Sequence, residues 1–313
     1  MFGEFIAILT TICWSIGIFP FTEASKRLGT QTLNQYRLLL AWLIISALII
    51  CIYPISFFEL FLIPKSNHYL FLGLSGIIGF TIGDYFSFSS FKLLGPKLGS
   101  LYTTIAPGAA LIAAYFFLNQ TTNEVGIFGI IVTMTGIIWL TLSKKDISTS
   151  EKAGFFRNPK GILYGLLGAV CQGTGLVLSK LGMDAYQTNL KTLHAVWIRL
   201  LFAFLAAFIL SIISGRLVSD AKPIFKNQNK GLLFLIVGTL FGPVLGVSLS
   251  LLAIQSIPVA TAQTIFALLP VVVLPINYFY YKEKITIHAV FACAIAVLGV
   301  FVLIWRNSIK LWI

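Results

Sequence analysis

Long runs of apolar residues, separated by short polar connections, follow one another along the whole chain. Ten of these runs have about the 17–25 residues that a helix needs to cross a bilayer. Their apolar character is continuous rather than alternating, which favours helices over membrane strands. The ten segments are residues 5–22, 33–53, 68–91, 98–118, 125–142, 161–182, 193–214, 231–255, 260–280 and 286–305. The pattern predicts an all-α membrane protein with ten transmembrane helices.

The composition agrees with this pattern. Of the 313 residues, 58% are apolar and only 10% are charged, whereas soluble chains carry about 25% charged residues. The first residues, MFGEFIAILTTICW, contain no Lys or Arg ahead of the apolar run. A cleaved signal peptide needs a basic start, so we expect the first helix to be retained.

The sequence repeats itself at an offset of 163 residues, without gaps, over the third to fifth predicted helices. The matched pairs are Gly79 with Gly242, Gly83 with Gly246, Ser87 with Ser250, Pro107 with Pro270, and Gly136 with Gly299. An offset of 162 also places Arg37 on Arg199 in the second helix of each copy. The repeat predicts two five-helix units, residues 1–142 and 161–313, joined by a basic linker, 143–160.

Five helices in each unit is an odd number, so the second unit must enter the membrane from the opposite face. The two units would then be inverted repeats, a design that transporters use with a solute site near the midplane. One unit rocking against the other would expose that site to each side in turn.

The net charge of +12 could suggest a nucleic-acid partner. The basic residues, however, lie in connections and at helix ends, which fits anionic lipid headgroups better. Connections 143–160 and 214–230 are the most basic, whereas the opposite face carries little beyond Lys65 and Lys191. The bias predicts a multi-pass protein of the cell (plasma or inner) membrane with both basic connections in the cytoplasm and both termini outside.

No metal or cofactor site is predicted. Each of the four cysteines falls in a different predicted helix, and the three histidines are equally scattered. Neither set has the close spacing of metal ligands. A phosphate-binding Gly-Lys-Ser/Thr loop is also absent from the sequence, so we do not expect this chain to use ATP.

Several motifs together resemble the EamA-type branch of the drug/metabolite transporter superfamily. They are an Arg that opens the second helix of each unit (Arg37, Arg199), a Pro in the fourth helix of each unit (Pro107, Pro270) and Glu283 just after the second of these helices. Gln120 stands at the place of Glu283 in the first unit, where the sequence departs from the family pattern.

The resemblance implies a carrier that exports small metabolites, such as amino acids, nucleobases or toxic organic compounds. It also implies a central cavity lined by helices one, three, four, six, eight and nine, with a small-molecule solute and membrane lipids as partners. Described members commonly place both termini in the cytoplasm, opposite to the charge bias. A monomer and a homodimer are both compatible with the sequence.

Asp84 is the most informative polar residue, because it lies inside the third predicted helix. A carboxylate there is costly and usually functional. Its repeat partner is Val247, so the fold does not require an acid. We hypothesise that Asp84 couples transport to protons or balances a cationic group of the solute. A structural ion pair, for instance with Lys92, is the alternative.

Five further residues are candidates for the wall of the solute site: Trp14, Ser100, Thr104, Gln172 and Gln263. Ser100 and Gln263 are repeat partners, and each precedes the helix Pro by seven residues on one helical stripe. Trp14 could stack on an aromatic or cationic solute. Hydrogen bonds between helices, or core packing, explain these residues equally well.

Pro107 and Pro270 are expected in mid-helix, where a proline removes a backbone donor and bends the helix. They would act as hinges or form static kinks. Arg37 and Arg199 would either anchor helix ends at the headgroups or form gating pairs, for example Arg37 with Glu23.

An enzyme is the alternative of a different class, and the sequence gives it little support. An intramembrane aspartyl protease needs two membrane aspartates, and Asp84 has no such companion, because the other aspartates fall in connections or at helix ends. A flippase for lipids or lipid-linked sugars is the closer alternative. A closed midplane cavity would favour the small-solute carrier, and a lateral opening would favour the flippase.

Overall fold

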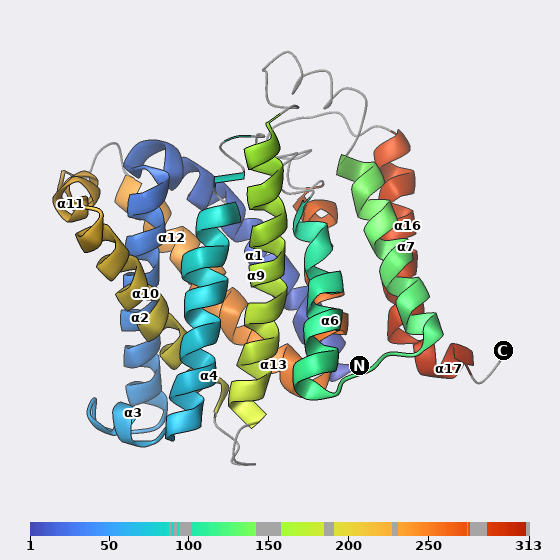
Figure 1. Ribbon diagram of the computed structural model, residues 1–313, viewed down its shortest axis with the longest axis horizontal. Helices are drawn as coiled ribbons and strands as arrows, with labels where there is room; N and C mark the ends of the chain where they lie inside the picture. The colour runs from blue at the N-terminus through green and yellow to red at the C-terminus, as the bar shows by residue number, and fades with distance from the viewer. Residues whose placement is uncertain are drawn as a thin grey trace.

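The computed structural model describes residues 1–87, 89–90, 93, 102–141, 158–184, 191–226, 231–273, 275 and 287–310. Every element in these ranges is helical, and the helices form one side-by-side bundle (Figure 1). The all-helical class predicted from the sequence is confirmed.

The first half of the chain forms α1 (Phe2–Leu28), α2 (Thr30–Ile52), α3 (Glu59–Leu62), α4 (Ser66–Gly76), η1 (Ile77–Gly83), η2 (Tyr102–Ile105), α6 (Ala106–Leu118) and α7 (Glu124–Thr141). The second half forms α9 (Pro159–Asp184), α10 (Thr192–Ile213), α11 (Leu217–Phe225), α12 (Gly231–Thr239), η5 (Leu240–Gly246), α13 (Val247–Ser256), α14 (Val259–Phe266), α16 (Ile287–Ile304) and α17 (Arg306–Lys310).

Seven helical stretches are long and apolar enough to cross a membrane: Phe2–Ser25, Thr30–Ile52, Ser66–Ser87, Pro159–Asp184, Thr192–Ile213, Gly231–Ser256 and Ile287–Ile304. Three apolar helices in the described ranges are shorter: Ala106–Leu118, Glu124–Leu140 and Val259–Val273. Together they overlap the ten predicted ranges. The protein is therefore a multi-pass membrane protein with seven helices of spanning length among the described residues.

One wide π-helical turn interrupts the third span of each half. η1 continues directly from α4, and η5 joins α12 to α13. The two turns stand at the 163-residue offset of the sequence repeat. A π turn bonds residue i to i+5, which leaves backbone groups without their α-helical partners. The local backbone geometry thus repeats along with the sequence.

The helices that form the fourth span of each half are also interrupted, at matched places. The 3₁₀ turn η2 precedes α6, and α14 stops at Phe266, after which residues 267–268 form a turn before helix resumes. Pro107 and Pro270 each lie in the first turn after this break. Their expected mid-helix position is wrong, because a residue without an N–H fits the start of a helix at no cost.

Glycines allow some of these helices to pack backbone to backbone. A Cβ added to Gly175 of α9 would lie 3.0 Å from the Cα of Gly79 in η1. A Cβ on Gly136 of α7 would lie 2.5 Å from the backbone nitrogen of Ala296 in α16. Small residues at such crossings are typical of membrane helices, because lipid provides no hydrophobic drive between them.

The pattern of helix packing stays the same when each helix is replaced by the corresponding helix of the other half. α7 packs on α16, and α2 packs on α10. α4 packs on α9 as α12 packs on α1, and α6 packs on α9 as α14 packs on α1. In Figure 1, α1 leaves the face that carries the N-terminus whereas α9 ends at that face, and α7 and α16 run in opposite directions.

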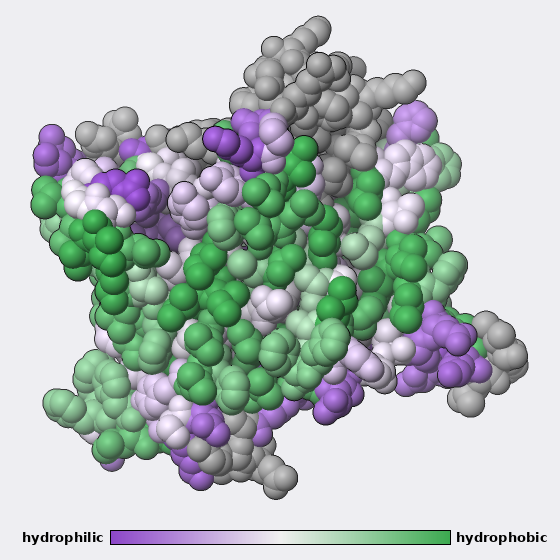
Figure 2. All heavy atoms as spheres, in the orientation of Figure 1, coloured by the Kyte–Doolittle hydropathy of each residue, from purple (hydrophilic) through white to green (hydrophobic). Residues whose placement is uncertain are grey.

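The outer surface is apolar around the middle of the bundle. Figure 2 shows hydrophobic residues over the centre of the visible face and hydrophilic residues towards its two ends. Exposed side chains include those of Phe116, Ile131, Leu163, Leu233 and Phe301. A surface of this kind faces lipid rather than water.

Candidate functional site

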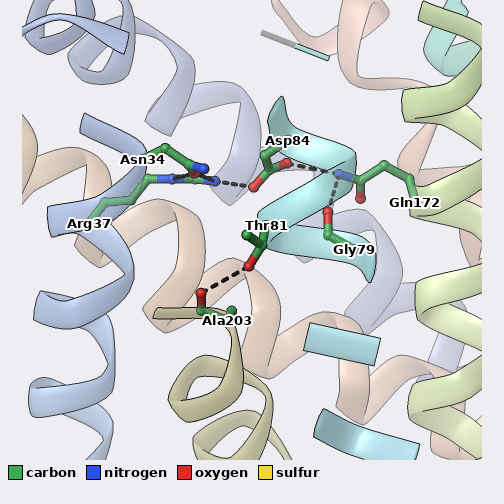
Figure 3. Close-up of polar contacts among 7 residues, drawn as sticks. All are labelled: Asn34, Arg37, Gly79, Thr81, Asp84, Gln172 and Ala203. Atoms are coloured by element: carbon green, nitrogen blue, oxygen red, sulfur yellow. Dashed lines mark hydrogen bonds and ion pairs between the residues drawn. The ribbon is translucent and has the colours of Figure 1, made fainter. Parts of the chain in front are cut away.

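A buried polar cluster joins three spans at the end of η1. Asp84 follows the π turn directly. One of its carboxylate oxygens forms an ion pair with Arg37 of α2. The other accepts a hydrogen bond of 2.9 Å from the side-chain amide of Gln172 of α9 (Figure 3). The side chains of Arg37 and Asp84 are only 10% and 13% exposed.

Two further contacts hold the partners of Asp84 in place. The Nε and Nη2 atoms of Arg37 donate to the side-chain oxygen of Asn34, at 3.0 and 2.8 Å. Gln172 also donates to the backbone oxygen of Gly79, at 3.3 Å. A buried ion pair is stable only when additional hydrogen bonds satisfy its remaining atoms. The cluster of Asn34, Arg37, Asp84 and Gln172, called the Asp84 cluster below, meets this condition.

Thr81 does not join the Asp84 cluster, although it lies only three residues before Asp84. Its hydroxyl donates to the backbone oxygen of Ala203 in α10, at 2.9 Å (Figure 3). The π turn rotates less per residue than an α turn, so the i, i+3 relation of an α-helix is lost here.

Arg199, the repeat partner of Arg37, approaches η1 from α10. Its side chain is buried, and its Cζ atom lies 4.4 Å from the centre of the Phe80 ring. Its Nε atom has no hydrogen-bond partner within the described residues. Both arginines lie two turns inside their helices and are buried. Neither therefore anchors a helix end at the headgroups.

The expected pair of Arg37 with Glu23 is replaced by the ion pair with Asp84. Glu23 pairs instead with Arg27, at 3.2 Å, one turn along α1. The ion pair links α2 to Asp84, which lies 47 residues away in the sequence, although the main packing partners of α2 are α10, α12 and α1.

The remaining candidates lie elsewhere in the bundle. Trp14 of α1 packs edge-on against Phe266 of α14, with ring centres 5.1 Å apart. Gln263 is half-buried on α14, and Thr104 is buried in η2. Ser100 lies outside the described residues. The structure brings Arg37, Asp84 and Gln172 together. Arg199 lies close to Gly79, whose carbonyl accepts a hydrogen bond from Gln172.

The sequence reasoning missed Asn34 and Phe80. Asn34 precedes Arg37 by three residues on the same helix, a spacing that places two side chains on one face and could have revealed it. Phe80 carries no such signal, because its contact with Arg199 depends on how α10 packs on η1.

A pocket of about 440 Å³ opens at the end of the bundle, away from the Asp84 cluster. Its lining comes from the ends of α2, α9, α10 and α13: Tyr53, Lys180, Met183, Asp184, Lys191, Thr192, Leu193 and Gln255. Lys180 pairs with Asp184 at 3.2 Å, and Lys191 lies 3.6 Å from the centre of the Tyr53 ring. None of the candidate residues lines this pocket.

Comparison with known proteins identifies the family of this chain. The model of the EamA-like transporter family matches residues 1–142 and 159–305, nearly the whole chain. The chain belongs to the EamA-like transporter family. A relative described as an uncharacterized transporter, from Clostridium kluyveri, is 25% identical over 233 residues, which cover 73% of this chain and 70% of the relative.

The fold of this EamA-like transporter also occurs in a solved structure, which is described only as the crystal structure of a protein. The two superpose with a TM-score of 0.69 over 96% of both chains, at 15% identity. At that identity the likeness concerns the fold alone. The family and the relative support a membrane transporter. Members of the EamA-like transporter family are in general not enzymes.

Proposed function

We propose that this protein is a secondary transporter that exports small organic metabolites by alternating access and couples the movement to protons through Asp84. The observation that carries the proposal is the Asp84 cluster. It joins α2, η1 and α9 through one buried carboxylate in a span. Ionisable residues at such depth are costly and mark solute paths or proton relays.

We further propose that the two units, 1–142 and 161–313, joined by linker 143–160, are inverted five-helix repeats of a ten-helix transporter. The exchange symmetry of the helix packing and the repeated π turns support this arrangement. The opposite directions of α1 and α9 agree with it (Figure 1). Rocking of one repeat against the other would open a midplane site to each face in turn.

The helix breaks provide places where this motion can bend the chain. The α-helical hydrogen-bond pattern of both fourth spans is interrupted just before a proline, at η2 and at residues 267–268. Hinges are commonly a few residues at the ends of elements that absorb the change in backbone angles. Pro107 and Pro270 would fix the start of the segment that follows each hinge.

A proton on Asp84 would loosen the three-span junction. The neutral acid cannot form an ion pair with Arg37, which still has Asn34 as a partner. Gln172 could still donate to the carbonyl oxygen of the neutral acid and to the Gly79 carbonyl, but neither acceptor would then carry a charge. Protonation thus weakens the link between α2 and Asp84 and favours rearrangement, whereas deprotonation restores the ion pair.

Transport into proteoliposomes, with and without a pH gradient, tests the proposal. Wild-type flux of a carried solute should rise with the gradient, whereas Asp84→Asn, which stays neutral at every pH, should transport slowly and ignore it. The Thr81→Val variant removes a neighbouring hydrogen bond outside the cluster and serves as the control. Normal flux and normal pH dependence in Asp84→Asn would refute proton coupling through this residue. Flux of labelled lipid in place of soluble metabolites would favour the flippase instead.

A further inference from the structure

Among the described residues, the region around η1 contains two buried arginines but a single carboxylate. Arg37 and Arg199 are 8% and 4% exposed. Both oxygens of Asp84 already have partners, Arg37 on one and Gln172 on the other. The charge of Asp84 attracts Arg199, but within the described residues no carboxylate forms an ion pair with it. A buried charge normally requires such a partner.

The repeat explains why Arg199 has no acid partner among the described residues. Asp84 pairs with Arg37 inside the first half of the chain. The residue that corresponds to Asp84 in the second half is Val247, which follows η5 directly and is buried. Arg199 therefore keeps the place of Arg37 without the anion that Arg37 has.

One nitrogen of the Arg199 guanidinium lies close to Gly79, which has no side chain of its own. A Cβ added to Gly79 would meet only the Nη2 atom of Arg199, at 3.5 Å, and the Cα of Gly175, at 3.9 Å. Both are ordinary contact distances, so a methyl group fits there without a clash. At Gly76, one turn earlier, a Cβ would instead lie 3.0 Å from the Cα of Arg199, against its backbone. Of these two glycines, only Gly79 leaves room for an added atom beside Arg199.

We propose that Arg199 binds an acid group of the transported solute, a carboxylate or a phosphate, beside Gly79. This inference rests on the proposed function as a transporter and narrows its substrate to solutes with such a group. The planar guanidinium has paired donors that match both acid groups. The solute would supply to the second arginine the negative charge that Asp84 supplies to the first.

Transport assays with solutes of different charge test the inference. The probes are succinate, glycerol 3-phosphate, uracil and putrescine, in proteoliposomes with wild type, Arg199→Gln, Arg199→Lys and Gly79→Ala. We expect flux of succinate or glycerol 3-phosphate in the wild type, and which of the two moves separates carboxylate from phosphate. Arg199→Gln should reduce that flux about ten-fold or more, because it removes a charged hydrogen bond. Arg199→Lys should retain part of it.

The Gly79→Ala variant tests the same site without removing a charge from the protein. The added methyl group makes ordinary contacts with Arg199 and Gly175, so the protein should fold, but it reduces the room beside the guanidinium and flux should fall. Gly108→Ala, where a Cβ meets nothing within 4 Å, is the matched control. Flux of only uracil or putrescine, or equal acid flux in wild type, Arg199→Gln and Gly79→Ala, would overturn the inference while leaving a transporter.

If none of the four solutes moves, the result counts against the proposed function with these probes, and binding decides the inference separately. The melting temperature of the purified protein is measured with succinate or phosphate against chloride at equal ionic strength. Stabilisation of the wild type but not of Arg199→Gln supports the acid site. Equal shifts in both proteins, or no shift in either, would contradict it.

Discussion

Asp84 depends on residues from two other helices, and each of them holds one of its oxygens. Loss of either charged member leaves the other charge buried in a low-dielectric interior, where it cannot recover its hydration. Neutral hydrogen bonds between membrane helices contribute much less, about 0.6 kcal/mol on average. The ion pair and the surrounding hydrogen bonds should therefore differ clearly in their effect on stability.

A double-mutant cycle measures this difference. Arg37→Gln and Asp84→Asn should each lower the free energy of unfolding by about 3 kcal/mol, since each leaves one buried charge unpaired. The double variant should lose less than the sum of the two, with a coupling energy above about 1 kcal/mol. Thr81→Val, which removes a neutral buried bond to Ala203, should cost about 0.6 kcal/mol. Additive losses in reversible unfolding experiments would exclude a coupled pair.

Among the elements, α7 and α16 pack backbone against backbone. Gly136 of α7 lies against the backbone of Ala296, and backbone cannot move aside as a flexible side chain can. The fit of this helix pair therefore depends on the absence of a side chain at one position.

Gly136→Ala should lower stability by about 1–3 kcal/mol, the usual cost of overpacking. Gly108→Ala makes the same chemical change in α6, where nothing lies within 4 Å. That control should be neutral or gain up to about 1 kcal/mol from higher helix propensity. Melting temperatures of the two variants in detergent give the comparison, and equal values would contradict the close packing of α7 on α16.

The spans could be predicted from the sequence because their length and apolar character follow directly from the bilayer. The repeat was visible because glycines and prolines, such as Gly79 and Pro107, recur at one offset. The partners of Asp84 were not predictable, since Arg37 and Gln172 are 47 and 88 residues away and meet it only through helix packing. The π turns were also missed, because a sequence pattern gives the apolar face of a helix but not a change in its hydrogen bonding.

At the scale of the whole molecule, the charged residues at the two ends of the bundle bear on its orientation. Arg216, Lys222 and Lys226 lie on or next to α11 at one end, whereas the N-terminus and α17, which carries Arg306 and Lys310, lie at the other (Figure 1). The positive-inside bias favours the α11 end in the cytoplasm and the termini outside. Placement of both termini in the cytoplasm, which the family resemblance implies, is the opposite arrangement.

Cysteine labelling in intact cells distinguishes the two orientations. In a variant with all four native cysteines replaced by Ser, exposed single cysteines are introduced as Ser219→Cys in α11 and Ser308→Cys in α17. A membrane-impermeant maleimide should label Ser308→Cys at once and Ser219→Cys only after permeabilisation. The reverse pattern would place the termini in the cytoplasm and show that the charge bias is overridden in this chain.

The matched wide turns at η1 and η5 also bear on how the repeated sequence evolved. A π turn is an α-helix that has accepted one extra residue, and both halves accepted it at the same register. One insertion in an ancestral five-helix segment, followed by its duplication, explains the match with fewer changes than two separate insertions. The wide turn would then be older than the difference between Asp84 and Val247. On that account the two halves shared this geometry first, and the acid at only one of the two matched positions reflects later divergence.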